Sequence, residues 1–194
     1  MSMKLGVVLL AAGRSARFGT NKLLADFCGR PMVCCALEAA TALQAARIVV
    51  VTGSAEIARW ADGYGCGVMV NDAPQLGQSH SIRMGVRAMR EMDAVLLMVC
   101  DQPHLTGASL ERLAQRYACS QQGIACLRDS THSGNPAIFS RRHFAELLAL
   151  EGDRGAKGVL RAHEGDLLVV ETIRPDELAD ADTPDTLEAM RKQR

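Results

Sequence analysis

The stretch Leu5-Gly-Val-Val-Leu-Leu10, with the loop Ala11-Ala-Gly13-Arg14-Ser-Ala-Arg17-Phe-Gly19-Thr-Asn-Lys22 after it, decides the fold. A continuous apolar run that ends in a glycine-containing loop is typical of a strand buried on both faces. Similar runs occur at Arg47–Thr52 and Ala94–Val99. The sequence therefore predicts a sheet covered by helices on both sides.

Strand patterns alternate with helical patterns along the chain. Further strands are expected at Gly67–Val70, 124–127, 136–139 and 167–170. Helices are expected at 31–45, after Gly53-Ser54, from a cap at Ser79, and over Gly107–Ala118, 143–150, 155–162 and 183–192. This order predicts a three-layer α/β/α, Rossmann-like fold with a mostly parallel sheet, in one domain over residues 1–194. Ligands of such sheets bind beyond the carboxyl ends of the strands, so we expect chemistry in the loops after Leu10, Val70 and Val99.

Composition narrows the function classes. Of the 194 residues, 22 are Lys or Arg and 22 are Asp or Glu, so the formal net charge is zero and nothing indicates a nucleic-acid partner. The seven cysteines are odd in number and lack a C-x-x-C pair, which favours reduced thiols in a cytoplasmic protein. The five histidines lack metal-ligand spacing and are expected to be surface or hydrogen-bonding residues. We expect a first strand rather than a secretory signal at 5–12, and no membrane-spanning segment.

The loop between Gly13 and Lys22 is the first candidate site. Small residues after a buried strand let backbone N–H groups approach a phosphate, and Arg14, Arg17 and Lys22 supply positive charge. The spacing matches neither G-x-x-x-x-G-K-[ST] nor G-x-G-x-x-G. An ordinary solvated basic loop is an equally good interpretation of this loop alone.

Two acidic positions are candidate metal ligands. Asp101 ends a predicted strand and can offer its carboxylate to Mg²⁺ at the ligand edge, although Asp before Pro103 also suits a turn. Asp182 can be a second ligand, but Asp182 or Thr183 can equally cap the last helix, and Asp180 is a weaker candidate.

Polar residues near the predicted helix at Ser79 are candidates for nucleotide contacts. Ser79 and Ser81 flank a helix N-terminus, which favours an anion or a polar base edge, although capping explains them as well. Asn71 can reach the base, but Asn71-Asp72 is also turn chemistry. Asp153 can cap a helix that starts at Gly155 or line an acceptor pocket.

Six short elements resemble one family when taken together. They are Leu10-Ala-Ala-Gly13 with Arg17-Phe-Gly19 and Lys22; Gly77-Gln-Ser79-His-Ser81-Ile-Arg83-Met-Gly85; Cys100-Asp101-Gln-Pro103; Ser133-Gly134-Asn-Pro136; Gly152-Asp153-Arg-Gly155-Ala-Lys157; and Asp180-Ala-Asp182-Thr-Pro184-Asp185. In this order and over nearly the whole chain, they resemble the signature of the MobA-like nucleotidyltransferases. The resemblance implies a fold of the nucleotide-diphospho-sugar transferase type.

The resemblance also implies roles for individual residues. Catalytic roles fall to Lys22, Arg17 and Asp101, and Mg²⁺ ligation falls to Asp101 and Asp182. Nucleotide binding falls to Leu10, Ala11, Ala12, Gly13, Arg14, Gly19, Lys22, Asn71, Ser79 and Ser81. Acceptor binding falls to Gly134, Pro136 and Asp153.

The Leu-Ala-Ala-Gly form looks more like molybdenum cofactor cytidylyltransferases than guanylyltransferases, which usually carry Leu-Ala-Gly-Gly. The implied substrates are CTP and a molybdopterin-type cofactor, with a molybdoenzyme as a possible client. GTP and another phosphorylated acceptor remain alternatives. From other classes, a nicotinamide-dependent oxidoreductase lacks its G-x-G-x-x-G, and a cofactor-carrying chaperone would need neither Lys22 nor Asp101.

Overall fold

The computed structural model describes residues 3–13, 18 and 21–193, and within these ranges it forms a seven-stranded sheet between two layers of helices. The strands are β1 (Leu5–Leu10), β2 (Arg47–Thr52), β3 (Gly67–Val70), β4 (Ala94–Val99), β5 (Ile124–Arg128), β6 (Ser133–Ser140) and β7 (Leu167–Glu171). They are arranged in the order β3-β2-β1-β4-β6-β5-β7. The α/β fold with a mostly parallel sheet is confirmed.

Strand direction divides the sheet into two parts. Strands β3, β2, β1 and β4 are mutually parallel, and β5 is parallel to β7. Strand β6 runs antiparallel to both β4 and β5, so it ends where β4 begins, with Ser140 opposite Ala94. The carboxyl ends of β1 and β4 meet, with Leu10 opposite Val99.

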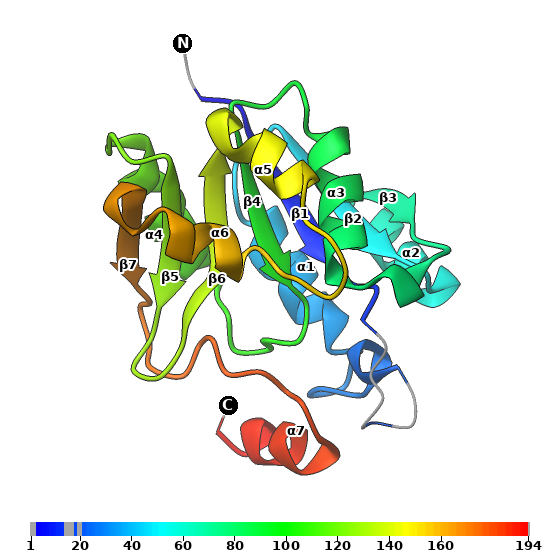
Figure 1. The fold of residues 1–194 in the computed structure, drawn as a ribbon. Coiled ribbons are helices and arrows are strands. Elements are labelled where there is room, and N and C mark those ends of the chain that lie inside the picture. Colours follow the sequence, from blue (N-terminus) through cyan, green and yellow to red (C-terminus); the bar gives the residue numbers. More distant parts are fainter. Residues whose placement is uncertain (1–2, 14–17, 19–20, 194) are drawn as a thin grey trace.

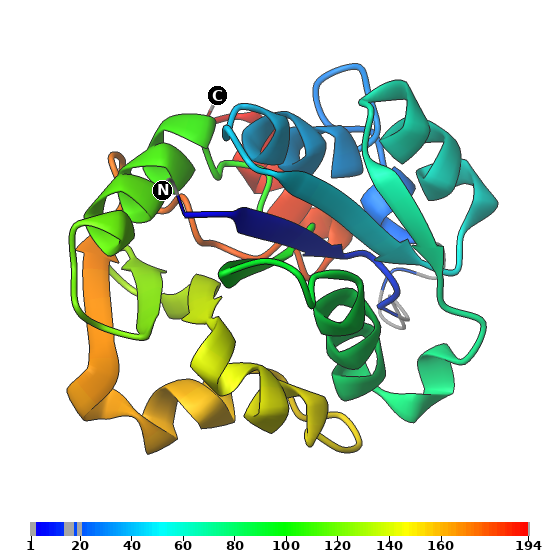
Figure 2. The same cartoon turned by 90° about the horizontal axis from the view of Figure 1, so that it is seen from above.

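Helices cover both faces of the sheet (Figures 1 and 2). They are α1 (Val33–Thr41), α2 (Ala55–Gly63), α3 (Gln78–Ala88), α4 (Gly107–Ala118), α5 (Phe144–Leu148), α6 (Lys157–Ala162) and α7 (Pro184–Arg191). Buried residues of α1, α2, α4 and α7 pack in one core, and those of α3, α5 and α6 pack in the other.

The side chains of β1 show why the sheet needs both layers. All six residues of β1 are buried. Val7 and Leu9 belong to the core under α1, whereas Val8 and Leu10 belong to the core under α3. Ile82 and Val86 of α3, together with its C-cap Met89, all pack in this second core.

The start of α3 differs from the prediction. The N-cap is Gly77 rather than Ser79, and Ser79 lies in the first turn. Gly77 has a φ of +83°, and a β-carbon there would collide with the backbone of Gly152 and Asp153. A residue with a side chain, such as serine, therefore cannot serve as this cap.

Several predicted helix boundaries are also too wide. The helix expected at 31–45 covers only Val33–Thr41, and Pro31 instead forms a bridge with Asp26. The helix expected at 143–150 is a 3₁₀ turn, Arg141–His143, followed by α5. The helix expected at 155–162 starts at Lys157, without a side-chain cap. Helix ends depend on caps that apolar periodicity does not show.

None of the helices in the described part of the chain has the length and apolar character needed to cross a membrane.

A pair of glycine substitutions tests the packing of α3 on β1. A β-carbon at Gly85 would overlap the Val8 side chain, whereas one at Gly158, an exposed position of α6, meets no atom within 4 Å. We expect Gly85→Ala to lower the free energy of unfolding by about 1–3 kcal/mol, because overpacking outweighs the gain in helix propensity. Gly158→Ala should raise it by about 0.5–1 kcal/mol. Urea denaturation measures both, and an equal gain from the two variants would contradict this packing.

Candidate functional site

A cavity of about 490 Å³ opens at the carboxyl ends of β1 and β4, where the three predicted loops, after Leu10, Val70 and Val99, meet the start of α3. Its lining consists of Leu10, Ala12, Gly13, Lys22, Leu23, Pro74, Gln75, Leu76, Gly77, Gln78, Ser81, Val99, Cys100, Asp101, Gly152 and Asp153. Most of these positions fall within the sequence elements quoted above. The fold therefore brings together segments that are far apart along the chain.

Lys22 lies between two carboxylates in this region. Its ammonium nitrogen is 2.6 Å from Asp101 Oδ2 and 3.0 Å from Asp182 Oδ1. The side chain of Lys22 is only 15% exposed, and that of Asp101 is 20% exposed. Burial by itself lowers the pKa of Lys22, but the two carboxylates outweigh it and leave the pKa above its ordinary value. Lys22 is therefore held as a cation at the pocket.

The segment that carries Asp182 reaches this point without regular secondary structure. It follows β7 and runs beneath the carboxyl edge of the sheet to α7 (Figure 1). The Ala181 N–H donates to the carbonyl of Asp101 (2.8 Å). The buried amide of Gln102 donates to both the Leu178 carbonyl and Asp180 Oδ1, each at 3.0 Å. The Asp101 loop thus fixes the position of the acidic segment.

Two further buried acids anchor the same segment. Asp129 accepts from the Leu178 N–H (3.0 Å), and Glu177 accepts from both the backbone and the hydroxyl of Thr106. Sequence reasoning missed Gln102, Asp129 and Glu177 as positioning residues. Their signal is weak, because a single polar residue in a sequence does not show that it is buried.

Asp101 and Asp180 have unusual surroundings for carboxylates. Asp101 Oδ1 is buried and has no hydrogen-bond partner among the described atoms. Asp180, the weaker candidate ligand, accepts from Gln102, and burial followed by the charge of Asp101 raises its pKa. A buried carboxylate oxygen without a donor costs free energy unless a cation or a donor reaches it.

The loop that contains Gly152 and Asp153 forms the part of the cavity wall next to the start of α3. The Gln78 N–H donates to Asp153 Oδ1 (3.2 Å), and the Ser79 N–H donates to the Gly152 carbonyl (3.3 Å). Asp153 therefore does not cap a helix at Gly155, one of its two predicted roles. It satisfies the first turn of α3 and lines the same cavity as Lys22.

The polar residues before and within α3 have distinct positions. Asn71 is buried, where its amide donates to Ser81 Oγ (2.9 Å) and its oxygen accepts from the Ala73 N–H. Ser81 lines the cavity, whereas Asn71 supports it from behind. The hydroxyl of Ser79 is fully buried and has no partner among the described atoms. Ala11 is buried too, and its N–H donates to the Val51 carbonyl (2.9 Å).

The predicted acceptor residues Gly134 and Pro136 lie in β6, outside the lining of this cavity. Gly134 has a φ of +101° and packs near Lys157 of α6. Asn135, between them, accepts from the Val99 N–H (3.2 Å) and so joins β6 to the end of β4, two residues before Asp101. Arg14, Arg17 and Gly19, assigned to the phosphate loop, lie outside the described residues.

A second hollow, of about 640 Å³, lies between α1 and the start of α4. Its basic residues already have partners: Arg30 pairs with Glu38, and Arg174 donates to the His104 carbonyl. It contains none of the predicted site residues. The cavity at Lys22 is therefore the candidate site.

Comparison with known proteins agrees with this geometry. The model of the MobA-like NTP transferase domain matches residues 7–167. The chain belongs to this family, so it is a nucleotidyltransferase that acts on a nucleoside triphosphate and a phosphorylated acceptor. The purine catabolism protein PucB of Bacillus subtilis is 28% identical, with 95% of each chain covered. The bifunctional protein GlmU of Streptomyces coelicolor is 35% identical over 131 residues, which are 62% of this chain but only 27% of GlmU.

Solved structures resemble the whole fold. Rv0371c of Mycobacterium tuberculosis H37Rv superimposes with a TM-score of 0.80 at 25% identity, covering 99% of each chain. A structure of the same protein in complex with manganese gives a TM-score of 0.78 at 26% identity and covers all of both chains. A nucleotidyl transferase from a Methanothermobacter species gives 0.82 at 24% identity, over 100% of this chain and 98% of that one.

Thr183 and Asp182 are neighbours with different roles: Thr183 stabilises α7, whereas Asp182 pairs with Lys22. Thr183, not Asp182, caps α7, in a reciprocal capping box with Thr186. We expect Thr183→Ala to lower the free energy of unfolding by about 1 kcal/mol, because one N–H of the first turn loses its acceptor. Asp182→Ala should change it by less than about 0.5 kcal/mol, since its side chain is 52% exposed. Thermal or urea unfolding of both variants measures this, and the reverse order would contradict the capping assignment.

Proposed function

We propose that this protein is a cytoplasmic, magnesium-dependent cytidylyltransferase that transfers CMP from CTP to the phosphate of a molybdopterin-type cofactor. The observation that carries the proposal is the position of Lys22, which lines the cavity together with Asp101 and whose ammonium group lies within 3.0 Å of both Asp101 and Asp182. A cation that faces two carboxylates beside a strand-to-helix loop is a suitable arrangement for a triphosphate and its metal ion.

The acidic group fits a divalent ion. Asp101 and Asp182 direct oxygens at the same ammonium group, and Asp101 Oδ1 is a buried oxygen with no donor among the described atoms. Hard oxygen donors of this kind suit Mg²⁺, which usually takes one or two carboxylates together with phosphate oxygens. Asp101 and Asp182 would hold it. When bound, the ion would neutralise negative charge on the triphosphate. The manganese complex of Rv0371c supports a divalent ion in a related protein.

The proposed reaction needs no protein nucleophile. An oxygen of the acceptor phosphate attacks the α-phosphorus of CTP, a new P–O bond forms, and the bond to the β-phosphate oxygen breaks with its electron pair leaving on pyrophosphate. An acceptor phosphate at neutral pH has little proton to lose, so alignment and charge neutralisation account for most of the catalysis. Lys22 supplies fixed positive charge, and the backbone at Gly13 can approach phosphate oxygens.

The base would lie between Ala12 and the residues before α3. Ala12, Gln75 and Ser81 all line the cavity, and the hydrogen bond from Asn71 holds the hydroxyl of Ser81. Asp153 lines the same cavity from the opposite loop. We assign the acceptor to the side of Asp153, with Gly134 and Pro136 farther along β6. Arg14, Arg17 and Gly19 would complete the phosphate loop.

The acceptor has a second candidate. PucB, 28% identical over nearly its whole length, is named for purine catabolism, which favours an acceptor connected with that pathway. A cofactor-carrying chaperone is the alternative without chemistry. The joint presence of Lys22 and Asp101 in one cavity favours the enzyme.

Neutralising Lys22 should remove nearly all turnover. We expect Lys22→Gln to lower kcat/KM for CTP by at least about a hundredfold, which corresponds to about 2.7 kcal/mol of transition-state stabilisation. Asp101→Asn should lower the magnesium-dependent rate similarly. Pyrophosphate release in the presence of CTP and molybdopterin measures both. Lys4→Gln, at an exposed position before β1, is the control and should keep the parent rate. Turnover of Lys22→Gln within a few-fold of the parent would overturn the triphosphate site.

Base choice is tested by thermal shift. We expect CTP with Mg²⁺ to raise Tm more than GTP at equal concentration, because a ligand bound only to the native state stabilises it by RT ln(1 + [L]/Kd). The triphosphates are identical, so discrimination has to come from the pocket around Ala12. The methyl group of Ala12 should change the difference in binding free energy between the two nucleotides by about 1–3 kcal/mol. We therefore expect CTP to bind roughly tens-fold more tightly than GTP. Equal shifts would overturn the cytidylyl assignment alone. A shift with molybdopterin but with neither nucleotide would favour the chaperone.

A further inference from the structure

Two histidines and a glutamate converge on the helical layer of α3, α5 and α6. His163 Nε2 lies 2.7 Å from Glu146 Oε2, and His143 Nδ1 lies 3.9 Å from the same oxygen. One potential ligand atom from each of the three residues lies within 4.8 Å of the other two. His143 belongs to the 3₁₀ turn before α5, Glu146 belongs to α5, and His163 follows α6. The cluster therefore joins two nearby residues at the start of α5 to one residue after α6.

A second carboxylate orients one of these ligands. Asp166 Oδ2 lies 3.1 Å from His143 Nε2. Arg142 Nε lies 3.5 Å from the same Nε2, farther than Asp166 Oδ2. With the proton on Nε2, directed at Asp166, Nδ1 presents its lone pair on the side of Glu146, too far away for a hydrogen bond. Asp166 is itself fixed by the Gly123 N–H (2.8 Å) and by Arg142 (2.6 Å), so the positive charge of Arg142 is already paired. A carboxylate behind a histidine is the arrangement that orients histidine ligands in metal sites.

We propose that His143, Glu146 and His163 form a binding site for one transition-metal ion of the zinc class. Imidazole nitrogens and one carboxylate suit Zn²⁺ or Co²⁺ better than Mg²⁺, and water would fill the fourth position. In a tetrahedral site, ligand atoms about 2.0–2.1 Å from the metal lie about 3.3 Å apart. The distances of 2.7 and 3.9 Å lie on either side of that value, and the potential ligand atoms of the two histidines lie within 4.8 Å of each other, so side-chain rotations that bring the imidazoles closer would complete the geometry.

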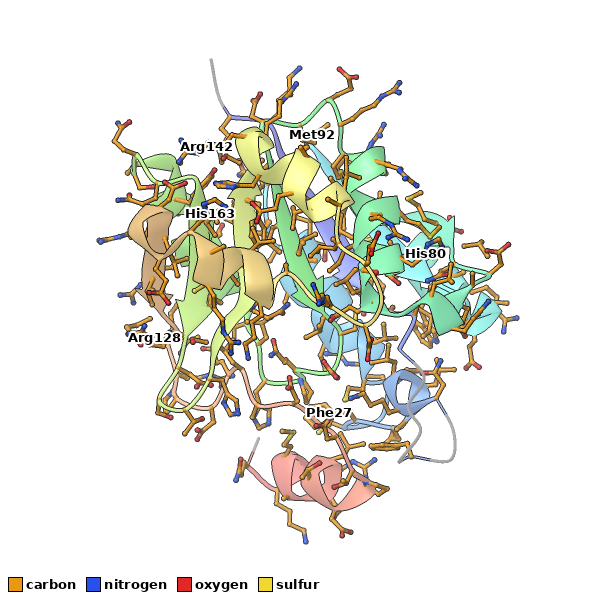
Figure 3. All side chains as sticks on the ribbon, in the orientation of Figure 1. Phe27, His80, Met92, Arg128, Arg142 and His163 are labelled. Atoms are coloured by element: carbon orange, nitrogen blue, oxygen red, sulfur yellow. The ribbon has the colours of Figure 1, made fainter. Side chains whose placement is uncertain are left out.

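This site is separate from the candidate active site. His143 follows β6, which ends opposite the first residue of β4, whereas Asp101 follows the last residue of β4. A strand of six residues spans on the order of 20 Å, so the two sites lie near opposite edges of the sheet. In Figure 3, Arg142 and His163 lie in the upper half of the view, whereas α7, which follows the segment that carries Asp182, lies in the lower half.

The metal would nevertheless fix a loop that reaches the cavity. Glu146 and His163 stand at the two ends of the segment 147–162, whose central loop packs on the first half of α3 (Figure 1). In that loop Leu150 accepts from Arg83, and Gly152 and Asp153 accept from the first turn of α3. An ion that ties both ends of the segment should therefore reduce opening of this loop.

The test is metal binding by the 194-residue chain, in a variant background in which other potential metal ligands are replaced. Asp101→Asn removes the acidic site, and Cys28→Ser with Cys119→Ser removes the two exposed thiols. We expect calorimetry to show one Zn²⁺ bound per chain, and Co²⁺ to give the visible absorption of a tetrahedral nitrogen–oxygen site. Glu146→Gln and His163→Gln should each weaken Zn²⁺ binding at least tenfold. Both side chains are more than one third exposed, so the fold should persist, as circular dichroism can verify.

His132→Gln is the matched control. His132 Nδ1 also lies beside a carboxylate, 3.3 Å from Asp129, but it belongs to no group of three potential ligands among the described residues. It should leave Zn²⁺ affinity unchanged. Equal affinity in Glu146→Gln, or the absence of tetrahedral Co²⁺ absorption, would overturn the site. Hydrogen exchange of residues 149–156 should slow on adding Zn²⁺ to the background protein but not to Glu146→Gln, and unchanged exchange would overturn the anchoring of the loop.

Discussion

The pairing of β1 with β4 is the constraint on which the rest of the structure depends. The two strands align residue for residue from Leu5 opposite Ala94 to Leu10 opposite Val99, and nearly every side chain along them is buried. A one-residue shift in register would turn each side chain of β1 toward the opposite core. The register is therefore firmly specified, and it fixes where Asp101 emerges relative to Ala12 and Gly13. The candidate site follows directly from this alignment.

The acidic half of the site depends on buried hydrogen bonds as well as on the apolar burial of Leu178 and Ala181. The segment between β7 and α7 gains little from regular backbone pairing, and its position rests on hydrogen bonds that it makes with Gln102, Thr106 and Asp129. A hydrogen bond contributes only about 1 kcal/mol net, but a buried partner left unpaired costs about 1–3 kcal/mol. The segment therefore has one low-energy position, because displacing it would strand several buried groups at once. That position places Asp180 and Asp182 beside Asp101.

The sequence predicted the fold well because buried parallel strands are long apolar runs that need no knowledge of distant contacts. The same reasoning located Lys22, Asp101 and Ser81, since each adjoins a strand end or a helix start in its own segment. It could not find the cap of α3, because Gly77 is required by the approach of Gly152, 75 positions later in the chain. For the same reason, the alternative role of Asp153 as the cap of a local helix was wrong, because its carboxylate instead accepts from the Gln78 N–H of α3.

The histidine cluster shows a second limit of sequence reasoning. Spacing rules compared histidines and cysteines with each other, whereas here the third potential ligand is Glu146 and the supporting group is Asp166. His143 and His163 meet only because β6 runs antiparallel to β4 and returns the chain to the start of β7. The sequence contains no indication of that direction. The sequence therefore could not predict contacts that depend on strand direction, even where it predicted the positions of the strands correctly.

On the proposed function, the charges at the site link nucleotide binding to metal binding. Asp101, Asp180 and Asp182 gather around the single ammonium group of Lys22, which leaves two net negative charges when all three acids are ionised. Burial and then the charge of Asp101 raise the pKa of Asp180, so ionisation of this third acid is less favourable than in water. A triphosphate brings several more, and a lysine shared between carboxylates cannot balance them alone. Asp101 and Asp182 would hold a divalent ion, whose charge would offset this repulsion, and Lys22 would then be able to face phosphate oxygens. The nucleotide should therefore bind as its metal complex.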